Sequence, residues 1–360
     1  MAFLEIKKTL VAESEKKAKP VGRDIGFGKV FTDHMFMMDY DEGKGWHSAR
    51  IVPYGPLELD PAAMILHYGQ AVFEGMKAYR SPEGKILLFR PQENFKRLNV
   101  SDDRMCIPHI DEDFALHALT ELIKVENDWV PSEPDTSLYI RPFVFANQPA
   151  VGVHPSKSYK FLIILTPVGP YYSTGLAPVK ILVEDEYVRA VRGGIGSAKA
   201  AANYAASLKA QQKAMDKGYA QVLWLDGLER KYIEEVGAMN MFFLMNDELV
   251  TPELNGSILP GITRASIIEL AKSWGMKVSE RRLSIDEVFK AAEDGSLTEA
   301  FGCGTAAVIA PIKEFLLGEK VVHISDGNTG PFAQKLYDNL TGIQFGKMPD
   351  PFGWSYEVTL

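Results

Sequence analysis

The sequence predicts two domains that mix helices and strands, of the α/β or α+β class. A length of 360 residues exceeds what one hydrophobic core usually organises. Short apolar runs with strand character alternate with segments of helical periodicity along the whole chain. The turn-rich stretch YYSTGLAP near the middle is typical of a linker. We therefore divide the chain into a smaller N-terminal domain (1–172), a linker (173–178) and a larger C-terminal domain (179–360).

Individual elements follow from apolar periodicity and from residues that start or stop helices. Ser284 and Glu287 form a capping box, Pro331 suits a first helical turn, and Gly218 suits a position just beyond a helix. Strands are expected at 85–89, 138–145, 159–166, 179–183, 221–225 and 241–244. Helices are expected after Pro91 and at 113–129, 201–217 and 263–274, from Ser284 to near Gly295, and from Pro331 to near Gly342.

Composition excludes several classes of function. The formal net charge is −8, so the surface repels phosphate backbones and no nucleic-acid partner is expected. Two cysteines, Cys106 and Cys303, imply no disulfide framework and fit a reducing compartment. The first residues have no signal-peptide core and no membrane span, so a cytoplasmic protein is expected. The seven histidines have no metal-ligand spacing, and no metal site is expected.

One lysine has unusual neighbours. Lys199 follows the glycine cluster VRGGIGSA and precedes a run of alanines, so a planar group could approach the backbone there. A desolvated lysine has a lowered pKa, and its neutral amine attacks carbonyl carbons. By itself, however, Lys199 fits equally well as a surface lysine that opens an alanine-rich helix.

Two further segments add chemistry to this lysine. In YIEEVGAMNMFF the adjacent carboxylates Glu234 and Glu235 point to opposite faces of a strand, so one of them is expected to be buried beside a cation. The segment ELVTPELNGSILPGITRAS (248–266) leads from a Pro-Gly turn into a helix, whose first backbone amides suit a phosphate. Taken singly, these are also an edge-strand charge pair and an ordinary loop–helix junction.

Taken together, these segments resemble the class IV aminotransferases, and most closely the branched-chain amino acid group. The compound pattern runs from Glu235 to Phe242, from Leu249 to Thr251 and from Leu259 to Arg264. Further segments with the same resemblance are HYGQAVFEGMKAYR (67–80), TSLYIRPFVFA (136–146), KAAANYAASL (199–208), QVLWLD (221–226) and FGCGTAA (301–307). The resemblance covers nearly the whole chain from about Gly26. It implies the fold type IV of pyridoxal-phosphate enzymes, with the cofactor at the interface of the two domains.

The resemblance also implies a role for each cofactor-binding residue. Lys199 would form the Schiff base with pyridoxal 5′-phosphate and carry the proton during ping-pong transamination. Glu235 would accept a hydrogen bond from the pyridinium nitrogen, and Tyr204 would bind the phenolic oxygen. The phosphate would be bound by Arg97, by the amides of Ile262 and Thr263, and by the Thr305 hydroxyl. Without the family match, Arg97 reads as a solvated helix arginine.

The substrates implied are leucine, isoleucine and valine with 2-oxoglutarate, in biosynthesis or degradation of these amino acids. Thr305 and Ala306 would bind the α-carboxylate with help from Tyr139, whereas Arg141 and Tyr68 would bind the side-chain carboxylate of glutamate. A homodimer with shared active sites is implied, because Val153 matches a residue that reaches in from the partner subunit. The other residues that match the substrate pocket are Phe73 and Tyr171. The aromatic residues fit plain core packing equally well.

Two alternatives remain open. A D-amino-acid aminotransferase or an aminodeoxychorismate lyase would use the same fold, and the segments Tyr139–Arg141 and 66–75 favour the branched-chain enzyme over both. A cofactor-binding protein without catalysis would lack at least one catalytic position, yet Lys199, Glu235 and Tyr204 are all present. The ranking of leucine, isoleucine and valine stays open, because one methylene discriminates by only ~1–3 kcal/mol.

Overall fold

The computed structural model describes residues 3–22, 25–170 and 175–360. The chain divides into two compact units. The first unit contains the chain up to Tyr171, joined by Ala198–Ala202 and Gly342–Leu360. The second unit contains Tyr172–Ser197 and Asn203–Thr341. The sequence-based division assigned 198–202 and 342–360 to the C-terminal domain. Residues 171–174, within or beside the predicted linker, lie outside the described residues.

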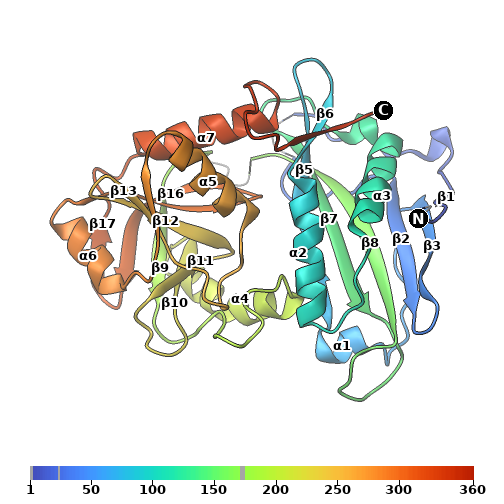
Figure 1. Cartoon of the computed structure of the whole chain (residues 1–360), viewed down its shortest axis with the longest axis horizontal. Helices are drawn as coiled ribbons and strands as arrows, with labels where there is room; N and C mark the ends of the chain where they lie inside the picture. Colours follow the sequence, from blue (N-terminus) through green and yellow to red (C-terminus); the bar gives the residue numbers. More distant parts are fainter. Residues whose placement is uncertain (1–2, 23–24, 171–174) are drawn as a thin grey trace. The chain divides into compact units, whose positions relative to one another are not determined.

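The first unit is built on one mixed sheet with the strand order β1-β3-β2-β8-β7-β5-β6-β18, and β4 also pairs with β7. Helices α2 and α3 lie together along this sheet (Figure 1). The strands are β1 (Lys7–Lys8), β2 (His34–Asp41), β3 (Gly45–Pro53), β4 (Ala71–Phe73), β5 (Met76–Arg80), β6 (Ile86–Phe89), β7 (Ser137–Ala146), β8 (Ser158–Val168) and β18 (Ser355–Val358). The helices are η1 (Glu13–Glu15), α1 (Met64–Tyr68), α2 (Pro91–Arg104), α3 (Glu112–Val125) and η2 (Asn127–Trp129).

Alternation along the strands divides the buried side chains of this sheet between two cores. Phe36 and Met38 of β2 pack in the core that contains the apolar residues of α2 and α3. Met35 and Met37 of the same strand belong to a second, smaller core. Successive side chains of a strand point to opposite faces, so a strand that is apolar on both faces is covered on both.

Backbone pairing explains why two distant segments belong to the first unit. Strand β18 pairs antiparallel with β6, so that Val358 lies opposite Ile86. Ala200 forms an isolated antiparallel bridge with Val72 of β4. Pairing between segments so far apart in the chain leaves no periodic signal in the sequence.

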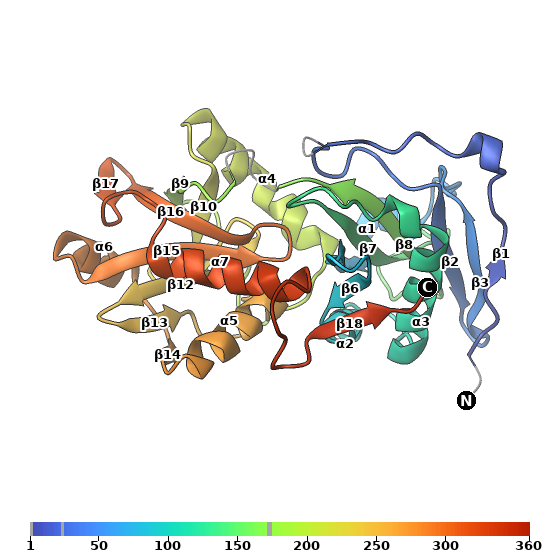
Figure 2. The same ribbon diagram turned by 90° about the horizontal axis from the view of Figure 1, so that it is seen from above.

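The second unit is a partly closed sheet with the order β11-β10-β9-β16-β15-β12-β13-β14, in which β11 also pairs with β12 and closes a ring of strands. Figure 2 shows helices α5 and α7 along this unit. The strands are β9 (Val179–Glu184), β10 (Gln221–Leu225), β11 (Ile233–Val236), β12 (Met239–Met245), β13 (Glu248–Thr251), β14 (Lys277–Glu280), β15 (Leu297–Gly304), β16 (Val308–Leu317) and β17 (Lys320–His323). The helices are α4 (Ala201–Asp216), α5 (Ile262–Ser273), α6 (Ile285–Glu293) and α7 (Pro331–Gln344), of which α4 and α7 each continue from one unit into the other.

Most of the expected elements are confirmed. The Ser284 side chain caps α6 by accepting a hydrogen bond from the Glu287 amide at 3.1 Å. Gly218 follows α4 with a φ of +78°, which is the left-handed conformation expected there. The helix expected over 113–129 is shorter, because α3 ends at Val125 and a separate 3-10 turn follows. Within the described residues, no helix is long and apolar enough to cross a bilayer.

Helix α2 contains a buried acid that has no partner. Asp102 is fully buried, and neither carboxylate oxygen has a hydrogen-bond partner among the described residues. Burial therefore raises the pKa of Asp102 well above its usual range. The folded chain retains a proton here that the unfolded chain loses above about pH 4. Stability is consequently lost as the pH rises from that value towards the folded pKa.

We predict that Asp102→Asn removes this pH-dependent loss. The free energy of unfolding of the variant should gain on the wild type as pH rises from about 4, by at most about 1.4 kcal/mol per pH unit. Urea unfolding at several pH values measures the difference. Asp103→Asn, at the exposed neighbouring position, is the control and should show no such trend. A constant offset between Asp102→Asn and wild type at all pH values would contradict the buried, protonated acid.

Candidate active site

Lys199 is fixed through its backbone in the first unit. Its amide donates to the Ser101 hydroxyl at 2.9 Å, and its carbonyl accepts from the Phe73 amide at 3.1 Å. The Lys199 ammonium nitrogen lies 5.0 Å from the centroid of the Phe73 ring. The residue is half-buried at the end of a turn. These contacts hold the lysine backbone to helix α2 and strand β4, so Lys199 is not the surface lysine that its neighbours in sequence also allowed.

A buried ion pair lies beside this lysine. Glu74 is 0% exposed and binds the Arg97 guanidinium through two hydrogen bonds, both 2.8 Å long. Asn94 donates to the same carboxylate at 2.7 Å. Burial raises the pKa of Glu74, but the charges and hydrogen bonds of Arg97, the nearby Lys199 and Asn94 outweigh it and hold the pKa below its usual range. Arg97 is therefore held in one orientation and is not a solvated helix arginine.

Three predicted substrate residues come together around one aromatic ring. The Arg141 guanidinium lies 4.6 Å from the Phe73 ring centroid and donates to the Tyr139 hydroxyl at 3.0 Å. The Arg141 Nε is buried and has no hydrogen-bond partner among the described residues. A Cβ added at Gly75 would lie 2.2 Å from the Tyr139 hydroxyl, so only glycine fits beside that group. A buried donor without a partner is a place where a ligand acceptor is expected.

Glu235 is the centre of a second set of contacts, in the second unit. Its carboxylate accepts from the Leu259 amide at 2.7 Å and forms an ion pair with Arg189 at 3.2 Å. Both carboxylates of β11 are buried, with Glu234 and Glu235 each 3% exposed. The sequence led us to expect only one. The difference arises because Glu234 has polar partners of its own, of which Asn255 donates to it at 3.3 Å.

The turn before α5 is held close to Glu235. The Asn240 amide donates to the Leu259 carbonyl at 2.9 Å, and Asn240 lies opposite Glu235 across β11 and β12. Helix α5 begins at Ile262, and its N-cap, Gly261, provides no side-chain cap. The amides of Ile262 and Thr263 thus belong to a first turn that no N-cap side chain covers, which is the usual arrangement at a phosphate-binding helix.

The other predicted residues of the second unit lie near or beyond this turn. Thr305 and Ala306 form the connection between β15 and β16, which begins two residues after Cys303. Cys303 lies opposite Asn240 across β12 and β15, which places the connection one strand away from Glu235. Burial raises the pKa of the Cys303 thiol, so this cysteine is unreactive. Tyr204 lies half-buried on α4.

Three predicted substrate residues are not brought into either set of contacts. Tyr68 is the last residue of α1 and is partly exposed. Val153 lies in the connection between β7 and β8 and is 88% exposed. Tyr171 lies outside the described residues.

The chain is similar to known proteins along most of its length. The family model for amino-transferase class IV matches residues 71–315. The chain belongs to the class IV aminotransferases. Among relatives, it is 59% identical over 345 residues to branched-chain-amino-acid aminotransferase 2 of Bacillus subtilis (strain 168), covering 96% of this chain and 95% of the relative. It is 50% identical to the branched-chain-amino-acid aminotransferase of Mycobacterium tuberculosis (strain CDC 1551 / Oshkosh), with 92% of each chain covered.

Solved structures of aminotransferases have the same fold. The Escherichia coli branched-chain amino acid aminotransferase matches with a TM-score of 0.77 and 29% identity, over 91% of this chain and 99% of that chain. The branched-chain aminotransferase of the thermophilic archaeon Thermoproteus uzoniensis, with norvaline, matches with a TM-score of 0.73 and 26% identity, over 90% of this chain and 100% of that chain. These matches confirm the predicted fold class, the fold type IV of this aminotransferase family.

Several residues of this class IV aminotransferase site were missed in the sequence. Glu74, Asn94 and Ser101 hold Arg97 and Lys199, and Arg189 and Asn240 surround Glu235. Glu74 lies in the segment 67–80, where an isolated acid between apolar residues was the available signal. Asn94 and Ser101 gave no signal, because polar residues on a helix are ordinarily solvated.

We predict that the Glu74–Arg97 pair is a large contribution to the stability of the first unit. Glu74→Gln should lower the free energy of unfolding by about 1.5–3 kcal/mol, because a charged hydrogen-bond acceptor is removed from buried Arg97. Urea unfolding measures this. The loss should shrink below about pH 4, since the lowered pKa of Glu74 gives stability that is lost as the pH falls through it.

The matched control for this prediction is Glu93→Gln. It removes the carboxylate of a surface pair with Lys96 on the same helix, and such pairs contribute about 0–1 kcal/mol. Equal losses for the two variants would show that the buried pair has no special weight.

Proposed function

We propose that this class IV aminotransferase transfers the amino group of leucine, isoleucine or valine to 2-oxoglutarate. Relatives named as branched-chain-amino-acid aminotransferases are up to 59% identical and match along nearly their whole length. Identity of this extent supports a shared reaction. The observation that carries the substrate proposal is the Phe73–Tyr139–Arg141 group, which combines aromatic surface with one buried cation.

Pyridoxal 5′-phosphate is the proposed cofactor, and the donor set of this chain fits it. The phosphate requires a fixed cation and backbone amides, and Arg97 and the first turn of α5 have these properties. When bound, the cofactor supplies an aldehyde for a lysine amine and a ring that accepts the electrons of the breaking Cα–H bond. Two further solved branched-chain amino acid aminotransferases, 25% and 26% identical to this chain, are described with N-(5′-phosphopyridoxyl)-L-glutamate and with pyridoxamine 5′-phosphate, respectively.

Each protein group has a defined task in this proposal. The Lys199 amine attaches the cofactor and, once released, moves the proton from the substrate Cα. Glu235 keeps the ring nitrogen protonated, and its ion pair with Arg189 keeps the carboxylate ionised. Tyr204 and Thr305 donate to cofactor oxygens. Ile262 and Thr263 supply backbone amides.

The substrate residues distinguish a carboxylate from an alkyl chain. Arg141 donates to the side-chain carboxylate of glutamate, with Tyr68 beside it, whereas Phe73 and Tyr171 contact the alkyl chain of leucine. The α-carboxylate is bound by Thr305, Ala306 and the Tyr139 hydroxyl. The Nε of Arg141, which has no partner among the described residues, supports the first role, because a bound carboxylate would satisfy that donor.

We propose further that the chain acts as a homodimer in the cytoplasm. Val153 is 88% exposed although it is a large apolar residue. A second copy of the chain that covers this loop would remove that apolar surface from water.

Transamination of L-leucine with 2-oxoglutarate, followed through the glutamate formed, tests the proposed reaction. We predict activity with L-leucine and none with D-alanine. Lys199→Ala should lower kcat at least about 100-fold, because the proton carrier is lost, with the circular dichroism spectrum unchanged. Lys209→Ala, at an exposed position of α4, is the matched control and should retain full activity. Activity on D-alanine alone, or full activity of Lys199→Ala, would contradict the proposal.

A further inference from the structure

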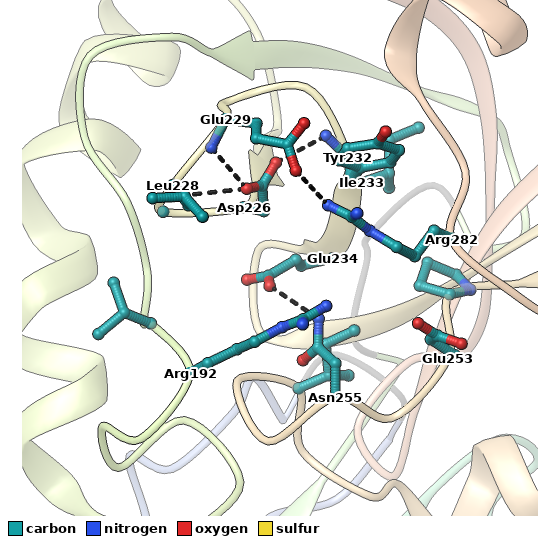
Figure 3. A pocket seen from close by; sticks show the side chains of 14 residues that line it. Arg192, Asp226, Leu228, Glu229, Tyr232, Ile233, Glu234, Glu253, Asn255 and Arg282 are labelled. Carbon is teal, nitrogen blue, oxygen red and sulfur yellow. Dashed lines mark hydrogen bonds and ion pairs between the residues drawn. The ribbon is translucent and has the colours of Figure 1, made fainter.

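The second unit contains a cavity that none of the proposed aminotransferase residues lines. Its volume is about 470 Å³, which suits a small molecule. It is bounded by the start of the glycine cluster, the turn between β10 and β11, strand β11 and the segment after β13 (Figure 3). Glu234 lines the cavity, whereas the neighbouring Glu235 is bound by Arg189 and Leu259.

Part of the charge in this cavity is already satisfied. The Asp226 carboxylate accepts four backbone hydrogen bonds from its own turn, at 2.8–3.2 Å. Burial raises the pKa of Asp226, but these bonds outweigh it and lower the pKa. Arg282 donates to Glu229 at 2.8 Å, and its guanidinium carbon lies 3.4 Å from the Tyr232 ring centroid. These groups form the wall of the cavity.

Three charged groups of the cavity are not fully satisfied. One oxygen of Glu234 has no hydrogen-bond partner among the described residues, although the residue is only 3% exposed. Within the described chain, neither the Arg192 guanidinium nor the Glu253 carboxylate has a hydrogen bond or ion pair. In Figure 3 the Arg192 side chain extends towards Glu234 and Asn255. Among the described residues, the cavity therefore offers one cation and two carboxylates that can still bind a ligand.

We propose that this cavity binds a small amino acid in its zwitterionic form. Arg192 binds the carboxylate of the ligand through paired N–H groups. Glu234 and Glu253 bind the ammonium group, and Ile258 provides an apolar wall for a short side chain. A ligand with both charges satisfies all three groups, whereas an anion or a cation alone would leave one sign unpaired.

The test is a methyl NMR titration of the full-length holoenzyme with labelled isoleucines. The probe is 2-aminoisobutyrate, a zwitterion that cannot be transaminated because its Cα has no hydrogen. The methyl signals of Ile258 and Ile233, which both line the cavity, should shift and saturate at millimolar concentrations. Isobutyrate and isopropylamine each carry one of the two charges and should bind about tenfold more weakly or worse.

Variants connect the shifts to the cavity. Arg192→Gln and Glu253→Gln change partly exposed side chains and should weaken binding about tenfold or more; Glu234→Gln should do the same. Glu319→Gln, at an exposed position in the turn before β17, should bind like the wild type. The proposal is overturned if Ile258 and Ile233 do not shift, if isopropylamine or isobutyrate binds as tightly as the zwitterion, or if Arg192→Gln and Glu253→Gln both bind normally.

Discussion

The buried ion pair between Glu74 and Arg97 is the interaction on which the surroundings of Lys199 depend. A buried carboxylate is stable only when a cation and hydrogen-bond donors satisfy it. Arg97 and Asn94 do so here from helix α2, and the same helix holds the Lys199 backbone through Ser101. The cation proposed for the phosphate and the reactive lysine are thus held by one helix.

Glu235 depends on a comparable arrangement in the second unit. Strands β11, β12 and β15 bring Glu235, Asn240 and Cys303 into register, and Asn240 in turn holds the turn before α5. A Cβ at Gly261 would lie 1.9 Å from the Asn240 side chain. The glycine of the L-P-G-I-T-R motif is therefore required by the contact with Asn240 as well as by the turn.

Local signals in the sequence predicted most of the elements, because capping residues, glycines and apolar periodicity act over a few residues. Ser284 and Gly218 are examples in which a side chain or a backbone conformation determines the end of an element. Pairing of β18 with β6 and of Ala200 with Val72 depends on contacts distant in sequence, so these pairings could not be predicted. The burial of both Glu234 and Glu235 could not be predicted for the same reason.

The central claim is that Lys199, fixed by Ser101 and Phe73, is the lysine that carries pyridoxal phosphate. Borohydride reduction of the holoenzyme followed by proteolysis and mass spectrometry tests it most directly, because reduction makes the linkage permanent. The account predicts the phosphopyridoxyl group on the peptide that contains Lys199 and on no other lysine. A phosphopyridoxyl group on a different lysine, with Lys199 unmodified, would contradict it.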